Sequence, residues 1–341
     1  MAEVNRMDNR SWIRQALAHK DGPVPYNLLV SPPAKAALDA HYGSPFEDAI
    51  GMPIRMSGTS SIKPLYADPD KYGPTIRDEF GVTWSTNKID RGSPIGPPLH
   101  EPNLDGFTWP DPTAGYRFDH LPAWTAQNQG HYLVLWVGDL WERATFMRGM
   151  EELLLDVFLH PQFVEELLEG LTEHILRTMQ CILDRGLAFD CIAVSDDYGT
   201  QHGMLISPEH WRRLIRPRLA RIYGLAKAHG KDVFHHTCGH VTPIIGDLID
   251  IGLDILHPIQ PEAMDVAELK RQFGRRLTFC GGLPTQGLLP CGTPQQVRDE
   301  VKRLKDVLGA GGGYILEPGI TIQADVPVAN MVAMIDEARR L

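Results

Sequence analysis

The segment from Phe234 to Gly239 carries the pair of side chains best suited to chemistry. His236 and Cys238 stand two residues apart at the end of an apolar run. In an extended chain such residues point to the same side, so an imidazole and a thiolate can face one pocket. Nitrogen and thiolate sulfur are common zinc ligands in proteins. The pair therefore predicts a zinc site, whereas His235 points to the opposite side and is interpreted as a packing or hydrogen-bonded histidine.

Two further candidate ligands follow other apolar runs. Cys280 precedes a Gly-Gly pair, and Glu317 ends the last apolar run of the chain. We predict both as metal ligands, because thiolate and carboxylate oxygen suit zinc. Cys280 could instead be a small buried apolar residue, and Glu317 could pair with a basic residue. Three other cysteines show no such convergence and are interpreted as structural: Cys181, Cys191 and Cys291.

Two more groups of polar residues follow apolar runs and are predicted to be catalytic. Asp196 and Asp197 come directly after the run 191–195, whereas His257 ends the run 254–257 and Gln260 follows it. Adjacent carboxylates at the end of a strand leave at least one facing the pocket. That carboxylate could be a metal ligand, a general base or the cap of a helix.

The elements that position these residues are short apolar runs separated by long amphipathic segments. This alternation, from Tyr132 onward, indicates βαβ units and a parallel sheet. The glycine fingerprint of a dinucleotide-binding sheet is missing, because the glycines at 309–313 precede a strand, so a barrel is favoured. In such barrels active sites lie at the carboxyl ends of the strands, where all these candidates fall. The predicted strands are 24–30, 132–137, 191–195, 232–236, 254–257, 277–280 and 313–316.

Proline and capping residues mark the predicted helices. One begins at Pro161, another at Pro208, a third spans 294–308 behind a capping-box pattern at Thr293 and Gln296, and the last spans 327–340. We predict one domain over 1–341, with an amino-terminal helix or extension at 1–23 and a loop insertion at 85–130. The stretch 90–122 is dense in proline, glycine and aspartate. Its neighbourhood carries aromatic residues that could form a lid or simply pack on the barrel: Trp109, Tyr116, Phe118 and Trp124.

Composition limits the class of protein and of partner. The chain has 341 residues, of which 43% are hydrophobic and 22% charged, which is typical of a globular protein with a large core. The formal charge of −10 argues against nucleic acid or an anionic membrane surface as a partner. No apolar run approaches the roughly 18 residues of a membrane span and no export signal is apparent, so we expect a cytoplasmic protein. Five cysteines, an odd number, predict reduced thiols.

Five short motifs between Trp136 and Leu341 resemble those of the uroporphyrinogen decarboxylase (URO-D) superfamily. The resemblance implies a single-domain α/β fold, a (β/α)8 TIM barrel. The motifs are DDYGTQ at 196–201, ISPE at 206–209, HTCG at 236–239, GGLPTQ at 281–286, and PGI at 318–320 followed by DVP at 325–327.

Within the superfamily, the chain is more similar to the zinc- and corrinoid-dependent methyltransferases. His236 and Cys238 match their His-x-Cys zinc motif, whereas the amino-terminal arginine signature of the porphyrinogen decarboxylases is missing. In those methyltransferases a third zinc ligand, a cysteine, follows the last strand, where this chain has Ile320. Cys280 or Glu317 could supply the missing contact.

The resemblance implies a zinc ion that assists methyl transfer between cobalt and a small methylated compound, such as an O-methyl compound, or a thiol. The corrinoid would be carried by a separate protein, because the chain lacks an Asp-x-His-x-x-Gly signature. Two alternatives are a metal-free decarboxylase that uses Asp196 or Asp197, and a non-catalytic member that kept the barrel.

Overall fold

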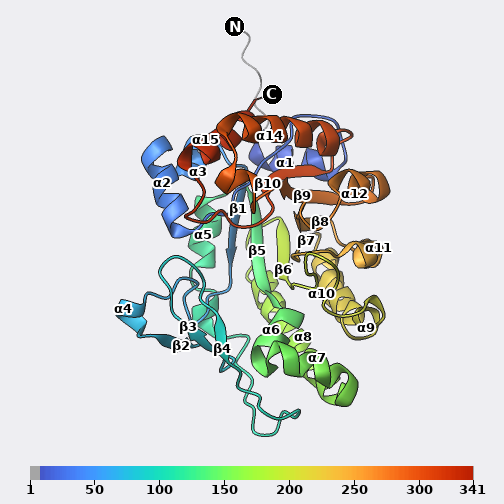
Figure 1. The fold of residues 1–341 in the computed structure, drawn as a ribbon. Helices are drawn as coiled ribbons and strands as arrows, with labels where there is room; N and C mark the ends of the chain where they lie inside the picture. Colours follow the sequence, from blue (N-terminus) through green and yellow to red (C-terminus); the bar gives the residue numbers. More distant parts are fainter. Residues whose placement is uncertain (1–7, 341) are drawn as a thin grey trace.

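A computed structural model describes residues 8–340 as an α/β barrel of the TIM type (Figure 1). Within that part of the chain, seven parallel strands form one curled sheet. The predicted first strand, 24–30, lies along the free edge of the last strand, where Tyr26 bridges to Leu316 and Val30 to Ile322. In order across the sheet, the strands are β1 (Ile54–Gly58), β5 (Tyr132–Asp139), β6 (Cys191–Ser195), β7 (Asp232–His236), β8 (Ile255–Ile259), β9 (Thr278–Leu283) and β10 (Tyr314–Pro318).

Alternate side chains of the strands fill the barrel interior, and the others pack under the helices. This division follows from the twofold repeat of a strand. The six strands predicted after Tyr132 are all present, with ends shifted by three residues or fewer. The interior layer consists of small and large apolar side chains, which close the barrel below the site: Ile54, Tyr132, Val134, Cys191, Ala193, Phe234, Ile255, Cys280 and Ile315.

Amphipathic helices surround the sheet. The capping box of the helix predicted at 294–308 is present, because Thr293 and Gln296 exchange hydrogen bonds. Among residues 8–340, no helix has both the length and the hydropathy that a membrane span requires. The helices after β5 are α6 (Trp141–Arg148), α7 (Met150–Leu159), α8 (Pro161–Asp184), α9 (Pro208–Leu214), α10 (Arg216–Ala228), α11 (Thr242–Asp250), α12 (Val266–Phe273), α13 (Leu288–Cys291), α14 (Pro294–Gly309) and α15 (Val328–Ala338).

The chain before β5 adds helices and a small antiparallel sheet. The small sheet lies at the same end of the barrel as α6 and α7, whereas the first three helices lie at the other end, beside α14 and α15 (Figure 1). The prediction of a loop over 85–130 is wrong in part, since a strand, a 3-10 turn and a helix lie within it. Strand β1 was not predicted, because it alternates apolar and polar residues over a short length, whereas the other strands were recognised as continuous apolar runs. The elements are α1 (Asn9–Leu17), α2 (Pro32–Tyr42), α3 (Phe46–Ile50), α4 (Pro69–Tyr72), the antiparallel strands β2 (Thr75–Arg77), β3 (Thr83–Ser85) and β4 (Pro94–Gly96), η1 (Gly115–Arg117) and α5 (Leu121–Gln127).

Candidate metal centre

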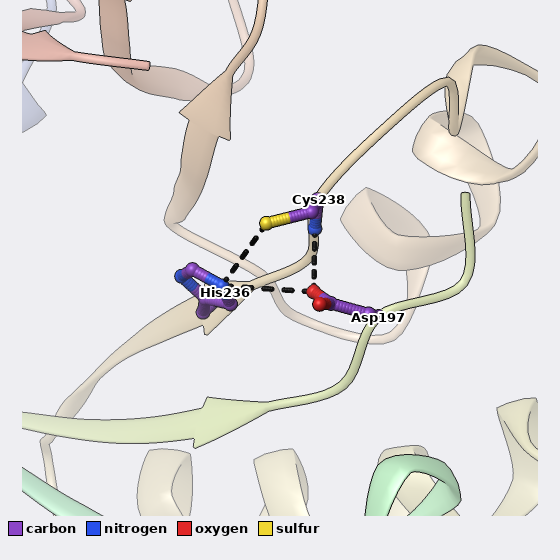
Figure 2. Close-up of side chains that lie close together, drawn as sticks. All are labelled: Asp197, His236 and Cys238. Carbon is purple, nitrogen blue, oxygen red and sulfur yellow. Dashed lines mark hydrogen bonds and ion pairs between the residues drawn. The ribbon is translucent and has the colours of Figure 1, made fainter. Parts of the chain in front are cut away.

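Three side chains point toward one another at the carboxyl ends of β6 and β7 (Figure 2). The Nε2 atom of His236 lies 3.4 Å from the Sγ atom of Cys238 and 3.6 Å from the Oδ1 atom of Asp197. A tetrahedral zinc ion with ordinary bond lengths holds a nitrogen and a sulfur about 3.5 Å apart. The donor types and their spacing therefore fit a zinc ion, and the three ligand atoms all lie within 4.8 Å of one another.

The loop that carries Cys238 is fixed by contacts with two neighbouring loops. The backbone N–H of Cys238 donates to Asp197 Oδ1 at 2.8 Å, and the backbone N–H of Gly239 donates to the side-chain oxygen of Gln260. Gly239 has a φ of 80°, and a Cβ atom there would lie 2.4 Å from the carbonyl carbon of Gly199. This close packing requires glycine and holds the thiol beside the imidazole. Gln260, predicted to be catalytic, therefore positions the loop.

The surroundings set the protonation of the two predicted ligands. Burial and the neighbouring His257 lower the pKa of His236 to about 4. Burial, followed by the charge of Asp197, raises the pKa of the Cys238 thiol. At neutral pH the imidazole is therefore unprotonated while the thiol keeps its proton, and a metal cation would replace that proton.

A second group lies deeper in the barrel and is fully buried. Cys280 Sγ donates to Glu317 Oε2 at 2.9 Å, Asn27 Nδ2 donates to the same oxygen at 3.0 Å, and His257 Nε2 lies 3.5 Å from Glu317 Oε1. The Nδ1 atoms of His257 and His236 are 2.9 Å apart, which links this group to the first. The four predicted ligands are thus divided between two adjacent groups, and of the predicted set only His236 and Cys238 lie together with Asp197.

Glu317 is ionised in this buried position. Burial raises the pKa of its carboxyl group, but His257 and the hydrogen bonds from Cys280 and Asn27 outweigh burial and leave the pKa below its ordinary value. Of the alternatives for Glu317, pairing with a basic residue is represented by His257, whose Nε2 atom lies 3.5 Å from Oε1; no lysine or arginine pairs with Glu317 among the described residues.

Asp196 holds the start of helix α6. Its Oδ1 atom accepts hydrogen bonds from the backbone N–H groups of Leu140 and Glu142 at 2.9 and 2.8 Å. Its Oδ2 atom accepts one from the hydroxyl group of Tyr198 at 2.7 Å. Of the roles left open for the two aspartates, the structure gives Asp196 that of a buried cap and places Asp197 beside the predicted ligands His236 and Cys238.

His235 occupies the opposite side of β7, as the strand period predicts. It is fully buried, its Nδ1 atom is 2.8 Å from the hydroxyl group of Tyr223, and its ring stacks on Tyr198. The interpretation of His235 as a packed, hydrogen-bonded histidine is confirmed.

A cavity of about 600 Å³ lies between the small sheet and the mouth of the barrel. Trp136 lines it, and the ring of Trp136 meets the ring of His236 edge-on at 6.3 Å between centroids, so the cavity adjoins the metal centre. Trp84 and Phe146 supply further aromatic wall. None of the four aromatic residues proposed from the sequence as lid or wall lines this cavity, and Phe118 is part of the core.

The charged groups of the cavity largely neutralise one another. Arg91 pairs with Glu142 at 2.9 Å, and Arg143 pairs with Asp78 at 2.7 Å. Lys63 donates to the carbonyl groups of Pro64 and Arg91 and lies over the ring of Trp84. No motif in the sequence marks these residues: Lys63, Asp78 and Arg91 lie in the segment before β5, and Glu142 and Arg143 lie in α6. The cavity therefore suits an uncharged ligand better than a polyanion.

Comparisons with known proteins agree with this architecture. A methyltransferase from Methanosarcina mazei has a similar structure, with a TM-score of 0.73 over 98% of both chains at 17% identity, a likeness that shows the fold. A uroporphyrinogen decarboxylase from Psychromonas ingrahamii is 23% identical over 268 residues, which are 72% of this chain and 72% of that protein. Residues 136–341 match the uroporphyrinogen decarboxylase (URO-D) family. Because this match covers more than half of the chain, the protein belongs to the URO-D family.

Proposed function

We propose that this protein is a zinc-dependent methyltransferase that works with a separate corrinoid protein. The observation that carries the proposal is the convergence of Asp197, His236 and Cys238 at the mouth of the barrel. Bound there, zinc would supply Lewis acidity toward a methylated heteroatom or would stabilise a thiolate acceptor. The full-length likeness to a protein described as a methyltransferase supports this assignment over other activities of the family.

Each residue near the centre has a separate task in this proposal. His236 Nε2, Cys238 Sγ and an oxygen of Asp197 hold the ion. Gln260 holds the Cys238 loop through Gly239. The corrinoid protein is expected at the barrel mouth, where the metal ligands lie.

We further propose an uncharged, small aromatic O-methyl compound as the methyl donor. The cavity volume of 600 Å³ is within the range of small-molecule sites, and its walls include Trp84, Trp136 and Phe146. Aromatic rings stack on such walls. The paired arginines, Arg91 and Arg143, are not free to bind the several carboxylates of a porphyrinogen, which counts against the decarboxylase alternative.

Metal analysis and a methylation assay on the same preparations test the proposal. The full chain should contain about one zinc per chain, which Cys238→Ala should lose and Cys291→Ala, at an exposed cysteine, should retain. With a reduced corrinoid, the cobalt spectrum should show methylation by methoxyarenes in the zinc-containing protein only.

Three results would contradict the proposal. The first is full activity in protein free of metal. The second is release of carbon dioxide from uroporphyrinogen by a protein inactive toward methyl donors, which would establish the alternative suggested by the Psychromonas relative. The third is zinc-loaded protein without turnover on any methyl donor or thiol, which would indicate a non-catalytic member.

A further inference from the structure

We propose that His257 and Glu317 are positioning residues of the metal centre, which hold His236 in the tautomer whose Nε2 lone pair is free for a cation. They do so through a chain of contacts that runs from His236 to His257 and ends on the buried carboxylate of Glu317. This inference rests on the proposed metal centre and adds two residues that do not touch the ion.

The first step is the contact between the two histidine rings. His236 directs Nε2 toward Cys238 and Asp197, so that its Nδ1 atom alone faces inward, 2.9 Å from Nδ1 of His257. Between two ring nitrogens at this distance, one must carry the proton and the other must accept it. A metal on Nε2 of His236 requires the proton on Nδ1 of the same ring, and His257 Nδ1 must then be the acceptor.

The second step fixes the proton of His257. A neutral ring whose Nδ1 accepts carries its own proton on Nε2. His257 is 1% exposed, and its Nε2 atom has no hydrogen-bond partner among the described residues, so Glu317 is the acceptor toward which it can direct its proton. The atom lies 3.5 Å from Glu317 Oε1, the longest link of the chain.

The third step is the state of Glu317. Its Oε2 atom receives the Cys280 thiol and the Asn27 amide, both as donors, so Oε1 is left to accept from His257. Both contacts to Oε2 come from donors, which favours the ionised carboxylate. No described lysine or arginine pairs with Glu317. Its negative charge would therefore favour a cation at the proposed metal centre, to which it is connected through the rings of His257 and His236. Carboxylates behind metal-binding histidines commonly have this role.

The inner group itself has the composition of a metal site, since His257, Cys280 and Glu317 offer ligand atoms within 4.8 Å of one another. The shared proton argues against ions in both places. If both histidines bound ions through Nε2, one proton would serve two Nδ1 atoms, and one ring would be an imidazolate. We therefore assign one ion per chain, beside Cys238, and assign His257 and Glu317 of the inner group to orienting His236.

The first arm of the test measures zinc affinity of the full chain by competition with a chelator. His257→Phe keeps a ring but removes the acceptor, and it should weaken zinc binding by about 10–100-fold. His257→Asn should stay within a few-fold of the wild type, because its amide oxygen can accept from His236 Nδ1. The zinc affinity of Glu317→Gln should lie between those of His257→Phe and His257→Asn. Cys280→Ala, the control in the same pocket, should bind one zinc with nearly unchanged affinity.

The second arm needs no metal and gives a signature that a purely structural role would not alter. In ring-¹⁵N-histidine-labelled protein free of metal, NMR should show His236 with its proton on Nδ1 in the wild type and in His257→Asn. In His257→Phe the proton should move to Nε2. Circular dichroism should show that each variant is folded.

The outcomes separate this inference from the proposed function. If the wild type binds no zinc, the proposed function fails, and the NMR result alone decides whether the histidine chain exists. If His257→Phe binds zinc as tightly as the wild type and keeps the Nδ1 proton, the inference is overturned while the function survives. Two zinc ions per chain, one of them lost in Cys280→Ala, would overturn it in favour of an inner metal site.

Discussion

Zinc binding should release one proton per chain between about pH 6 and pH 8, and that proton should come from Cys238. The pKa of His236 is lowered to about 4 by burial and by His257, so its ring has no proton to lose in this range. The pKa of the Cys238 thiol is raised by burial and by Asp197, so it stays protonated until a cation replaces its proton. One released proton makes the apparent affinity rise about tenfold, or ~1.4 kcal/mol, per pH unit, and about a hundredfold from pH 6 to pH 8.

Calorimetry in two buffers of different ionisation enthalpy counts the released protons, and chelator competition at three pH values gives the slope. Cys238→Asp is the matched variant, because it offers a carboxylate oxygen that is already unprotonated, and its slope should be close to zero. A wild-type slope near two would mean that a second ligand loses a proton and would refute the argument from burial of His236. A slope near zero in the wild type would remove Cys238 from the ligand set.

Other predictions concern the loop, the core and a helix cap. Gly239→Ala should lower zinc affinity at least tenfold, because the new Cβ would lie 2.4 Å from Gly199 and displace the Cys238 loop. Gly230→Ala, also at positive φ but with open space, should cost only about 1–2 kcal/mol of unfolding free energy and leave zinc affinity unchanged; equal affinities in the two variants would contradict this. Burial lowers the pKa of His174 from 6.5 to about 4, so the unfolded chain binds this proton first. Its contribution to stability is complete above pH 6.5 and is lost as the pH falls toward 4, and urea unfolding of His174→Phe should show a smaller loss over that range; parallel curves would refute it. Thr293→Ala should cost about 0.5–2 kcal/mol in urea unfolding and Thr293→Ser much less, unless the capping box contributes nothing.

Much of the barrel and two of the three donors of the candidate metal centre, His236 and Cys238, could be predicted from local sequence. Strand β7 was placed at its observed bounds, and the twofold period correctly sent His236 and Cys238 to one side and His235 to the other. These features depend on residues that are close in the chain. Local sequence could not predict which of Asp196 and Asp197 faces the candidate metal centre. The answer depends on how the chain turns after β6, where Asp196 contacts the start of α6 and Asp197 contacts the Cys238 loop.

The division of the predicted ligands into two groups depends on strand register. His257 is the direct neighbour of His236 across β7 and β8, whereas Glu317 stands opposite Gly282, two residues beyond Cys280 in β9. The sequence predicted that all of these residues lie at strand ends, but it did not predict how deeply each side chain lies within the barrel. The residues that line the cavity were not predicted for another reason. Arg91 lies in a segment without periodic apolar residues, and its partner Glu142 is 51 residues away in the sequence.

A carboxylate among the proposed ligands distinguishes the proposed centre from the one that the family resemblance implies. Ile320, where a third cysteine was expected, is 43% exposed and is not among the clustered ligands. In the proposed centre, Asp197 would supply the third donor from the opposite side, after β6. One thiolate and one carboxylate carry the same charge as two thiolates and balance a zinc ion equally well. Carboxylate oxygen is the harder ligand and donates less electron density than sulfur, so the ion would keep more Lewis acidity. Activation of an ether oxygen requires that property, whereas a thiol acceptor is served well by a sulfur-rich site. The exchange of ligand therefore favours methyl removal from an O-methyl donor as the direction of the proposed reaction.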